Sequence, residues 1–228
     1  MGALLTEFTS LDFVALALLL IGWAGTSFVV EHPGPLRPSV SQLMERYRSE
    51  WMVEMLTRQP RIFDAAILAT LRQGTTFLAS GSMIALGGVL ALAGNAPQID
   101  AFTQPVLGEA HSQAFWQAKL AIVALLLAHA LFKFIWSNRL FGYCAVVMAS
   151  TPNDPDDPRA APRAAKAAEI NQRAALNFNR GLRSIYFAVA GLAWLIGAVA
   201  LLIAAVLVVA SIMSREFGSN ARAVLAEK

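Results

Sequence analysis

The stretch NFNRGLRSIYFAVAGLAWLIGAVALLIAAVLVVASIM, from Asn177 to Met213, decides the fold class of this chain. Between Arg183 and Arg215 the chain has 31 consecutive uncharged residues. An α-helix needs only about 20 apolar residues to cross the hydrocarbon core of a bilayer. The stretch therefore predicts a transmembrane helix over 183–213. Polar side chains gather at the start of this helix: Asn177, Asn179, Arg180, Arg183 and Tyr186.

The composition of the whole chain points to the same class. Of its 228 residues, 57% are hydrophobic and only 14% are charged, compared with about 25% charged residues in a typical soluble domain. So few polar residues cannot cover the surface of a soluble globule, and the chain is predicted to be an integral membrane protein. The small net charge of +3, with basic residues placed beside apolar segments, argues against a nucleic-acid partner. The single cysteine, Cys144, excludes an internal disulfide.

Three more segments have the length and apolar character of membrane spans, so the sequence predicts one all-α, polytopic domain over 1–228. The first segment is preceded by acidic residues and no basic ones, which favours a retained span over a signal peptide. Lys119 and Lys133 lie near the two ends of the third segment, and we expect both to extend toward the membrane surfaces. The four predicted spans are about 12–31, 70–94, 114–137 and 183–213.

The segments between the spans have distinct patterns. Residues 38–59 carry apolar side chains at spacings of three and four, which predicts an amphipathic cytoplasmic helix. Residues 151–162 form a linker rich in Pro and Asp. Beyond it, basic residues recur along one face of a long helix that leads into the fourth span. Residues 214–228 are a polar tail.

Small residues recur on the faces of two spans. Gly22, Gly25 and Thr26 share one face of the first span. In the second span, Gly81 with Ala85 and Gly87 with Ala91 are pairs four residues apart. Small residues allow helix backbones to approach closely in lipid. These faces are therefore predicted helix-packing surfaces.

The distribution of Lys and Arg predicts an orientation. The 31–61 and 139–180 segments, with the adjoining Arg72, Lys133 and Arg183, hold 14 of the 18 Lys and Arg residues. The positive-inside rule places this side in the cytoplasm. With four spans, both the N- and C-termini are then expected outside the cytoplasm, and Cys144 inside it.

Three segments carry a resemblance to a known family. They are LRQGTTFLASGSMIALGGVLALAG from Leu71, LFKFIWSNRLFGYCAVVMA from Leu131, and NFNRGLRSIYFAVAGLAWLIG from Asn177. In these segments the chain resembles the bacterial and plant membrane proteins catalogued as domain of unknown function 599, and it departs from the family pattern at Ile185. The resemblance implies a polytopic membrane protein, and we expect it in the bacterial inner (cytoplasmic) membrane. It implies no activity, cofactor or substrate.

The sequence contains few signs of catalytic chemistry. It has no P-loop, no HExxH and no GxSxG motif, so neither nucleotide binding nor hydrolysis of the usual kinds is indicated. His129 is the only histidine within a predicted span, whereas haem held between helices needs two. A serine hydrolase would require Ser80 or Ser82 beside His129. We therefore expect no catalytic residues, no metal and no cofactor, and a protein that is not an enzyme.

Polar residues gather at the predicted cytoplasmic ends of spans two, three and four. We call this group the cationic collar. Its basic members are candidates for binding an anion or a lipid headgroup, since desolvated positive charge requires a negative partner. The basic members are Arg72, Lys133, Arg139, Arg180 and Arg183, and the neutral polar network is Gln73, His129, Asn138, Asn177, Asn179 and Tyr186. The simpler interpretation is that these groups only anchor the helices at the membrane surface.

Two functional hypotheses remain open at this stage. The first is an accessory or scaffold protein that binds lipid or another membrane complex through the small-residue faces and the cationic collar. The alternative is a homo-oligomeric channel or transporter for a small anion or solute. A conduit needs polar residues at the membrane midplane, whereas Leu195–Val209 is wholly apolar. The sequence therefore favours the accessory role, and the identity of the partner stays open.

Overall fold

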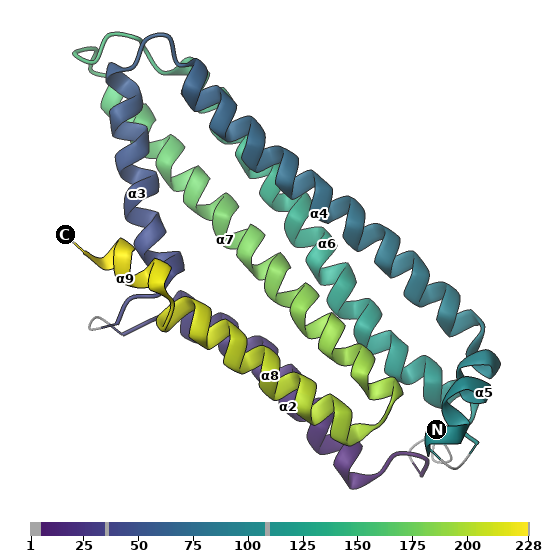
Figure 1. The fold of residues 1–228 in the computed structure, drawn as a ribbon. Coiled ribbons are helices and arrows are strands. Elements are labelled where there is room, and N and C mark those ends of the chain that lie inside the picture. The colour runs from purple at the N-terminus through teal and green to yellow at the C-terminus, as the bar shows by residue number, and fades with distance from the viewer. Residues whose placement is uncertain (1–5, 35–36, 108–109, 228) are drawn as a thin grey trace. The chain divides into compact units, whose positions relative to one another are not determined.

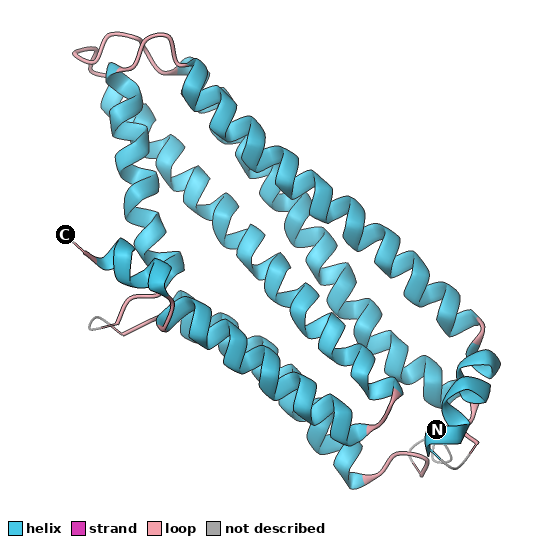
Figure 2. Cartoon of the chain, in the orientation of Figure 1, coloured by secondary structure: helices cyan, strands magenta, loops and turns pink. Residues whose placement is uncertain are grey.

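The computed structural model of the chain describes residues 6–34, 37–107 and 110–227, and the regular structure in these ranges is helical (Figure 2). Figure 1 labels the principal helices. Two short 3-10 segments, η1 (Met55–Thr57) and η2 (Ala193–Leu195), adjoin them. The α-helices are α2 (Ser10–Glu31), α3 (Val40–Glu54), α4 (Ile62–Gly94), α5 (Ala96–Leu107), α6 (Gln113–Ser150), α7 (Ala160–Leu192), α8 (Ala198–Phe217) and α9 (Asn220–Ala226).

Several of these helices suit a membrane. In the described ranges, four helical segments are long and apolar enough to cross one: Ser10–Glu31, Ile62–Gly94, Gln113–Ser150 and Ala198–Ala226. Their most apolar windows have mean hydropathies between 1.8 and 2.3. The predicted all-helical membrane class is therefore confirmed at this level. Helix α7, which carries the basic stripe, is not one of the four.

The prediction of one continuous helix over 183–213 is wrong. Helix α7 ends at Leu192, η2 follows, and α8 begins at Ala198. Gly197 lies between them with φ of 147°, a backbone conformation that side chains with a Cβ rarely adopt. Apolar residues surround this glycine on both sides, so the composition of the segment conceals the break.

The other predicted segments correspond more closely to the structure. The 38–59 segment contains α3 and η1, and Ser39 caps α3 by accepting a hydrogen bond from the Gln42 amide. The 151–162 linker covers the connection between α6 and α7, and the 214–228 tail includes α9. Helices α4 and α6 are longer than the spans predicted within them, because α4 begins at Ile62 and α6 ends at Ser150.

The chain forms two compact units. Unit 1 comprises Met1–Val29, Gly81–Ala130 and Leu182–Ser214, and unit 2 comprises Val30–Ser80, Leu131–Gly181 and Arg215–Lys228. Each boundary falls within a helix, so α2, α4, α6, α7 and α8 each contribute to both units. The segment after α8 belongs to the same unit as α3. The expectation that both termini lie outside the cytoplasm stays a prediction.

Close helix packing in unit 1 depends on two glycines. A Cβ at Gly22 of α2 would lie 2.9 Å from Val209 Cγ2 of α8 and 3.2 Å from Phe187 Cε1 of α7. A Cβ at Gly191 would lie 3.1 Å from Val123 Cγ2 of α6. Gly22 therefore packs as the sequence predicted. Among the described residues, however, a Cβ at Gly25, Gly81 or Gly87 would meet nothing within 4 Å.

The break between α7 and α8 has a buried cation beside it. The Lys119 ammonium donates to the Trp194 carbonyl at 3.0 Å and lies 4.1 Å from the centre of the Phe115 ring. The Trp194 indole in turn donates to Asp12 Oδ1 at 2.6 Å. Lys119 is only 2% exposed, so the expectation that it extends to the membrane surface is wrong. A carbonyl at the end of a helix lacks an intrahelical donor, and Lys119 supplies one.

Unit 2 has its own apolar core. Residues from α3 and η1, α4, α6 and α7 pack together in it: Met52, Met55, Leu56, Leu68, Leu140, Phe141, Cys144, Met148, Ala160, Ala164, Ala167, Ala168 and Ala174. The contribution of α7 is entirely alanine, which permits close packing. Further along α7, a Cβ at Gly181 would lie 2.7 Å from Cε1 of the buried Phe134.

We expect Gly181→Ala to destabilise the protein by about 1–2 kcal/mol, because overpacking a filled core costs roughly 1–3 kcal/mol and exceeds the gain in helix propensity. The measurement is the apparent Tm of the protein purified in detergent, which should fall by several degrees. Gly142→Ala is the matched control, since a Cβ at that position in α6 would meet nothing within 4 Å. Equal Tm values for the two variants would contradict the packing described.

Candidate functional site

Unit 2 contains an apolar cavity between α4 and α6, with a volume of about 310 Å³. We call it the α4–α6 cavity. Its α4 residues recur at spacings of three and four, so they share one face of the helix, and its α6 residues do the same. η1 contributes Met55. The lining residues are Met55, Arg61, Ala65, Leu68, Ala69, Arg72, Ala145, Met148 and Ala149.

The cavity exists because small side chains face one another. Ala65 and Ala69 of α4 and Ala145 and Ala149 of α6 are four of the lining residues. Ala65, Ala69 and Ala149 are exposed, so the cavity opens at the surface of the two helices. Alanine at all four positions leaves space that leucine would fill. The apolar lining would favour an apolar occupant over water.

A buried carboxylate holds the end of α3 against α4. Asp64 is 0% exposed. It accepts a hydrogen bond from the Trp51 indole at 2.7 Å and forms an ion pair with Arg58. Met55 lies between Trp51 and Arg58 in the sequence. These bonds therefore fix the position of Met55, the residue that η1 contributes to the cavity.

Arg61 ties the start of α4 to the end of α6. Its two terminal nitrogens donate to the carbonyls of Thr151 at 2.8 Å and Pro152 at 2.7 Å. A cation at the C-terminal end of a helix interacts favourably with the helix dipole. The Nε of Arg61 is buried and has no hydrogen-bond partner among the described residues. Arg61 therefore holds the two helix ends together, and its Nε–H donor forms no hydrogen bond among the described residues.

Arg72 is the second basic residue of the cavity, and it is exposed. Its Nε donates to Asn138 Oδ1 at 3.3 Å, and Asn138 donates to Thr76 Oγ1 at 3.1 Å. Within the described part of the chain no hydrogen bond is recorded for its terminal nitrogens. Arg72 therefore presents a guanidinium group that is held in place and is able to bind an anion.

The outer surfaces of the same helices are apolar. Ile62 and Phe63 of α4 are 71% and 60% exposed, and Val146 of α6 is 68% exposed. Large apolar side chains with this exposure are unfavourable in water. Such side chains would suit lipid or an apolar protein surface as their neighbour.

The structure divides the predicted cationic collar into separate local contacts. In unit 2, Arg180 forms a two-pronged ion pair with Glu31, with distances of 2.9 Å and 2.6 Å. Asn179 donates to Ser41 Oγ at 3.2 Å. Arg139 donates to Tyr143 on its own helix at 2.5 Å, and Asn177 donates to the Arg173 carbonyl at 2.8 Å. Of the collar residues described, only Arg72 lines the α4–α6 cavity.

The collar residues of unit 1 form another group. Arg183 donates to Ser27 Oγ at 3.0 Å. His129 Nδ1 lies 2.8 Å from Ser184 Oγ, which also accepts a hydrogen bond from the Trp23 indole at 3.0 Å. A serine does lie beside His129, and it is Ser184. Ser184 is fully buried, so its contact with His129 is part of the helix packing.

Gln73, Lys133 and Tyr186 are the remaining residues of the collar. Gln73 is exposed, whereas Lys133 and Tyr186 are half-buried.

The sequence did not indicate the role of Arg61 or the hydrogen bond between Trp51 and Asp64. The spacing of Arg61, Ala65, Leu68, Ala69 and Arg72 contained a signal, because it places two basic and three apolar residues on one helix face.

Comparison with known proteins gives one match. A family model described as "Protein of unknown function, DUF599" matches residues 14–221. No curated protein and no solved structure matches the chain.

Replacing Asp64 tests whether this carboxylate holds the cavity wall. We expect Asp64→Ala to lower the free energy of unfolding by about 2–3 kcal/mol, because it leaves the Trp51 indole and the Arg58 guanidinium without their acceptor. Removing one partner of a fully buried pair costs about 3–5 kcal/mol, and the Arg58 side chain is 35% exposed, which reduces the loss. The measurement is thermal unfolding in detergent.

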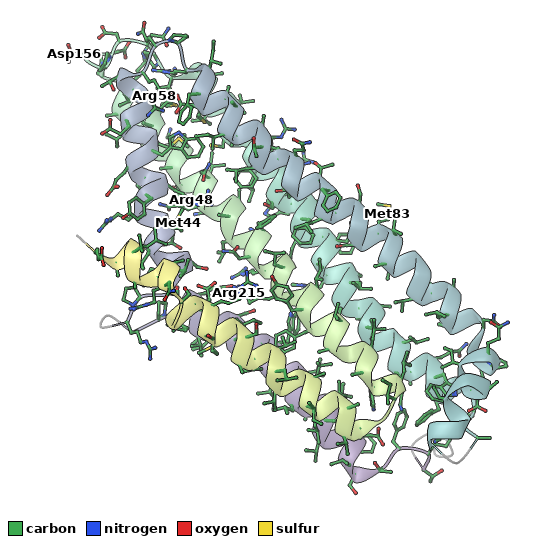
Figure 3. The ribbon with its side chains drawn as sticks, in the orientation of Figure 1. Met44, Arg48, Arg58, Met83, Asp156 and Arg215 are labelled. Carbon is green, nitrogen blue, oxygen red and sulfur yellow. The ribbon has the colours of Figure 1, made fainter. Side chains whose placement is uncertain are left out.

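The control is Asp156→Ala, in the exposed connection between α6 and α7 (Figure 3). It should leave the Tm unchanged. A Tm for Asp64→Ala that matches this control would show that the buried carboxylate does not hold α3 and α4 together.

Proposed function

Given that the chain belongs to the DUF599 family, whose description states no function, we propose that it is a non-enzymatic accessory protein of a membrane. In this proposal it binds an anionic lipid in the α4–α6 cavity. The observation that supports it is an apolar cavity whose lining includes the exposed Arg72, a guanidinium group held by one hydrogen bond from its Nε to Asn138.

The cavity offers an apolar lining for the acyl chain of such a lipid and a basic side chain for its phosphate. Burial of a methylene group contributes about 0.8 kcal/mol, so an acyl chain gains from contact with Leu68, Met148 and the four alanines. A volume of about 310 Å³ is at the low end of the range for ligand pockets, about 300–1,000 Å³. It therefore suits part of one acyl chain. The planar guanidinium group of Arg72 suits a phosphate.

The distribution of charge supports a cytoplasmic location for unit 2. The segments of unit 2 hold 16 of the 18 Lys and Arg residues, and only Lys119 and Arg183 lie in unit 1. By the positive-inside rule, unit 2 then belongs to the cytoplasmic side. The chain begins in unit 1, and its last segment, after α8, belongs to unit 2. We therefore propose that the C-terminus lies in the cytoplasm and the N-terminus outside it. The membrane in this proposal is the bacterial inner membrane.

The homo-oligomeric channel or transporter is the weaker candidate. Several polar groups of unit 1 that a conduit would need already bond to one another, as in the contacts of Ser184 with His129 and Trp23 and of Lys119 with the Trp194 carbonyl. The proposal of an accessory role needs no such path.

Lipid retention tests the proposed site. After purification in mild detergent, native mass spectrometry should show more bound phosphatidylglycerol than phosphatidylcholine. We expect Ala69→Leu to reduce phosphatidylglycerol retention at least fivefold, because leucine fills the cavity. Arg72→Gln should reduce the preference for phosphatidylglycerol and leave phosphatidylcholine retention unchanged, because it removes only the charge.

The matched control is Ala66→Leu, an exposed position of α4 that does not line the cavity. It should retain lipid as the unmodified protein does. Equal loss in Ala66→Leu and Ala69→Leu, or full retention in both Ala69→Leu and Arg72→Gln, would refute lipid binding at this site.

Cysteine labelling tests the proposed orientation. In a Cys144→Ala background, Glu227→Cys should react in intact cells only with a membrane-permeant maleimide, because we place the C-terminus in the cytoplasm. Gln113→Cys, at the first residue of α6, should react with an impermeant maleimide. Labelling of Glu227→Cys by the impermeant reagent would instead support the four-span arrangement with both termini outside.

A further inference from the structure

A second cavity of unit 2 lies between α3 and α7 and has a different character. Its volume is about 200 Å³, and we call it the α3–α7 cavity. Met44 and Arg48 lie on the side of α3 that faces α7 (Figure 3). The lining residues share one face of α3 and one face of α7, with Glu216 added from α8: Val40, Ser41, Met44, Glu45, Arg48, Gln172, Ala175, Leu176, Asn179 and Glu216.

Most polar groups of this cavity are already bonded. Glu216 accepts hydrogen bonds from the Ser41 amide at 3.0 Å and from the Ser41 hydroxyl at 3.1 Å. Asn179 donates to the same hydroxyl. Gln172 donates to the Glu45 carbonyl at 3.0 Å and to Ser49 Oγ at 2.8 Å. These bonds join α3, α7 and α8, and they account for the uncharged polar side chains.

Two opposite charges remain. Glu45 and Arg48 line the cavity three residues apart on α3, yet no ion pair or hydrogen bond joins their side chains in the described part of the chain. Among those residues the Glu45 carboxylate has no recorded partner, and the Arg48 guanidinium has one, Asn171 Oδ1 at 2.5 Å. Burial raises the pKa of the Glu45 carboxyl, and the nearby Arg48 opposes that rise. Glu45 remains partly exposed and Arg48 is half-buried, so a small ligand that carries both charges can reach each group.

We infer that the α3–α7 cavity binds an aminoethyl phosphate group. The primary ammonium of this zwitterion would bind the Glu45 carboxylate, and its phosphate would bind the Arg48 guanidinium. An ammonium offers several N–H donors to a carboxylate, and a guanidinium matches the geometry of a phosphate. The apolar side chains of Val40, Met44 and Leu176 also line the cavity. They would contact the two methylene carbons of the ligand that join its ammonium to its phosphate.

Charge and size both favour this ligand class. Glu45, Glu216 and Arg48 give the lining a formal charge of −1, which disfavours a purely anionic ligand. The volume is below the usual range for drug-sized ligands, about 300–1,000 Å³, so a small molecule or a headgroup fits. Two sources carry the same group: free phosphoethanolamine and the headgroup of phosphatidylethanolamine. The inference concerns a different cavity from the proposed lipid site and stands independently of it.

The test is isothermal titration of the purified full-length protein in detergent with phosphoethanolamine, phosphocholine and inorganic phosphate. In parallel, native mass spectrometry compares retention of phosphatidylethanolamine and phosphatidylcholine. We expect the ethanolamine compounds to bind at least tenfold better than the choline compounds, because a trimethylated ammonium cannot donate hydrogen bonds to Glu45. Binding of free phosphoethanolamine identifies a soluble ligand, and binding of the lipid alone identifies a headgroup site.

Substitutions in α3 test whether Glu45 and Arg48 bind the ligand. Glu45→Gln and Arg48→Gln should each weaken binding of the ethanolamine compound at least tenfold. Glu45→Gln loses no side-chain bond of the fold, so it remains informative even if loss of the Asn171 bond unfolds Arg48→Gln. The matched controls are Glu50→Gln and Arg46→Gln, which remove an exposed ion pair of the same helix and should leave binding unchanged. Failure to prefer ethanolamine over choline, or equal loss in Glu45→Gln and Glu50→Gln, would overturn the inference.

Discussion

The hydrogen bond from the Lys119 ammonium to the Trp194 carbonyl is the interaction on which the arrangement of the chain depends. In apolar surroundings, backbone polar groups need partners within the protein, and a broken helix exposes several of them. The buried lysine satisfies one such carbonyl where α7 ends. The chain can then reverse, so that Phe187 and Val209 both lie beside Gly22. In one straight helix these two residues would be about 33 Å apart.

The reversal determines what unit 2 contains. Because α8 leads back into unit 2, Glu216 meets the N-terminus of α3 through Ser41, and Arg222 donates to the Pro38 carbonyl at 2.9 Å. The α3–α7 cavity owes one of its carboxylates to this contact. The α4–α6 cavity has another origin, the facing alanines, and Asp64 holds the segment that contributes Met55 to its lining. The two cavities therefore present different chemistry, one apolar with a cation and one with both charges.

The sequence was sufficient to predict features that depend on local composition. The length of the apolar segments indicated α2, α4, α6 and a helix within 183–213. The spacing of apolar side chains indicated α3, and the order of residues in three segments indicated the family. The break at Gly197 was not predictable in this way, because apolar residues surround it and only the packing of α2 and α6 against η2 makes it stable. For the same reason the burial of Lys119 was missed, since its acceptor is created by that break.

At the candidate site too, the sequence predicted a local feature and missed one that depends on tertiary packing. Arg72 was identified because a basic residue at the end of an apolar segment is visible in the sequence. The cavity beside it was not, because it requires Ala65 and Ala69 to face Ala145 and Ala149, residues far apart in the chain. The convergence of the cationic collar stays a prediction. The partners of Arg180 and Arg183 were not predictable, because Glu31 and Ser27 of α2 take positions that depend on tertiary packing.

Cross-linking of Ser41→Cys with Glu216→Cys, in a Cys144→Ala background, tests the reversal of the chain most directly. A short thiol-specific bifunctional reagent applied to intact membranes should join these positions as efficiently as the reference pair Ser49→Cys and Gln172→Cys, whose native side chains lie 2.8 Å apart. Efficient reaction of the reference pair with none between positions 41 and 216 would contradict the account. It would show that α8 does not return to α3.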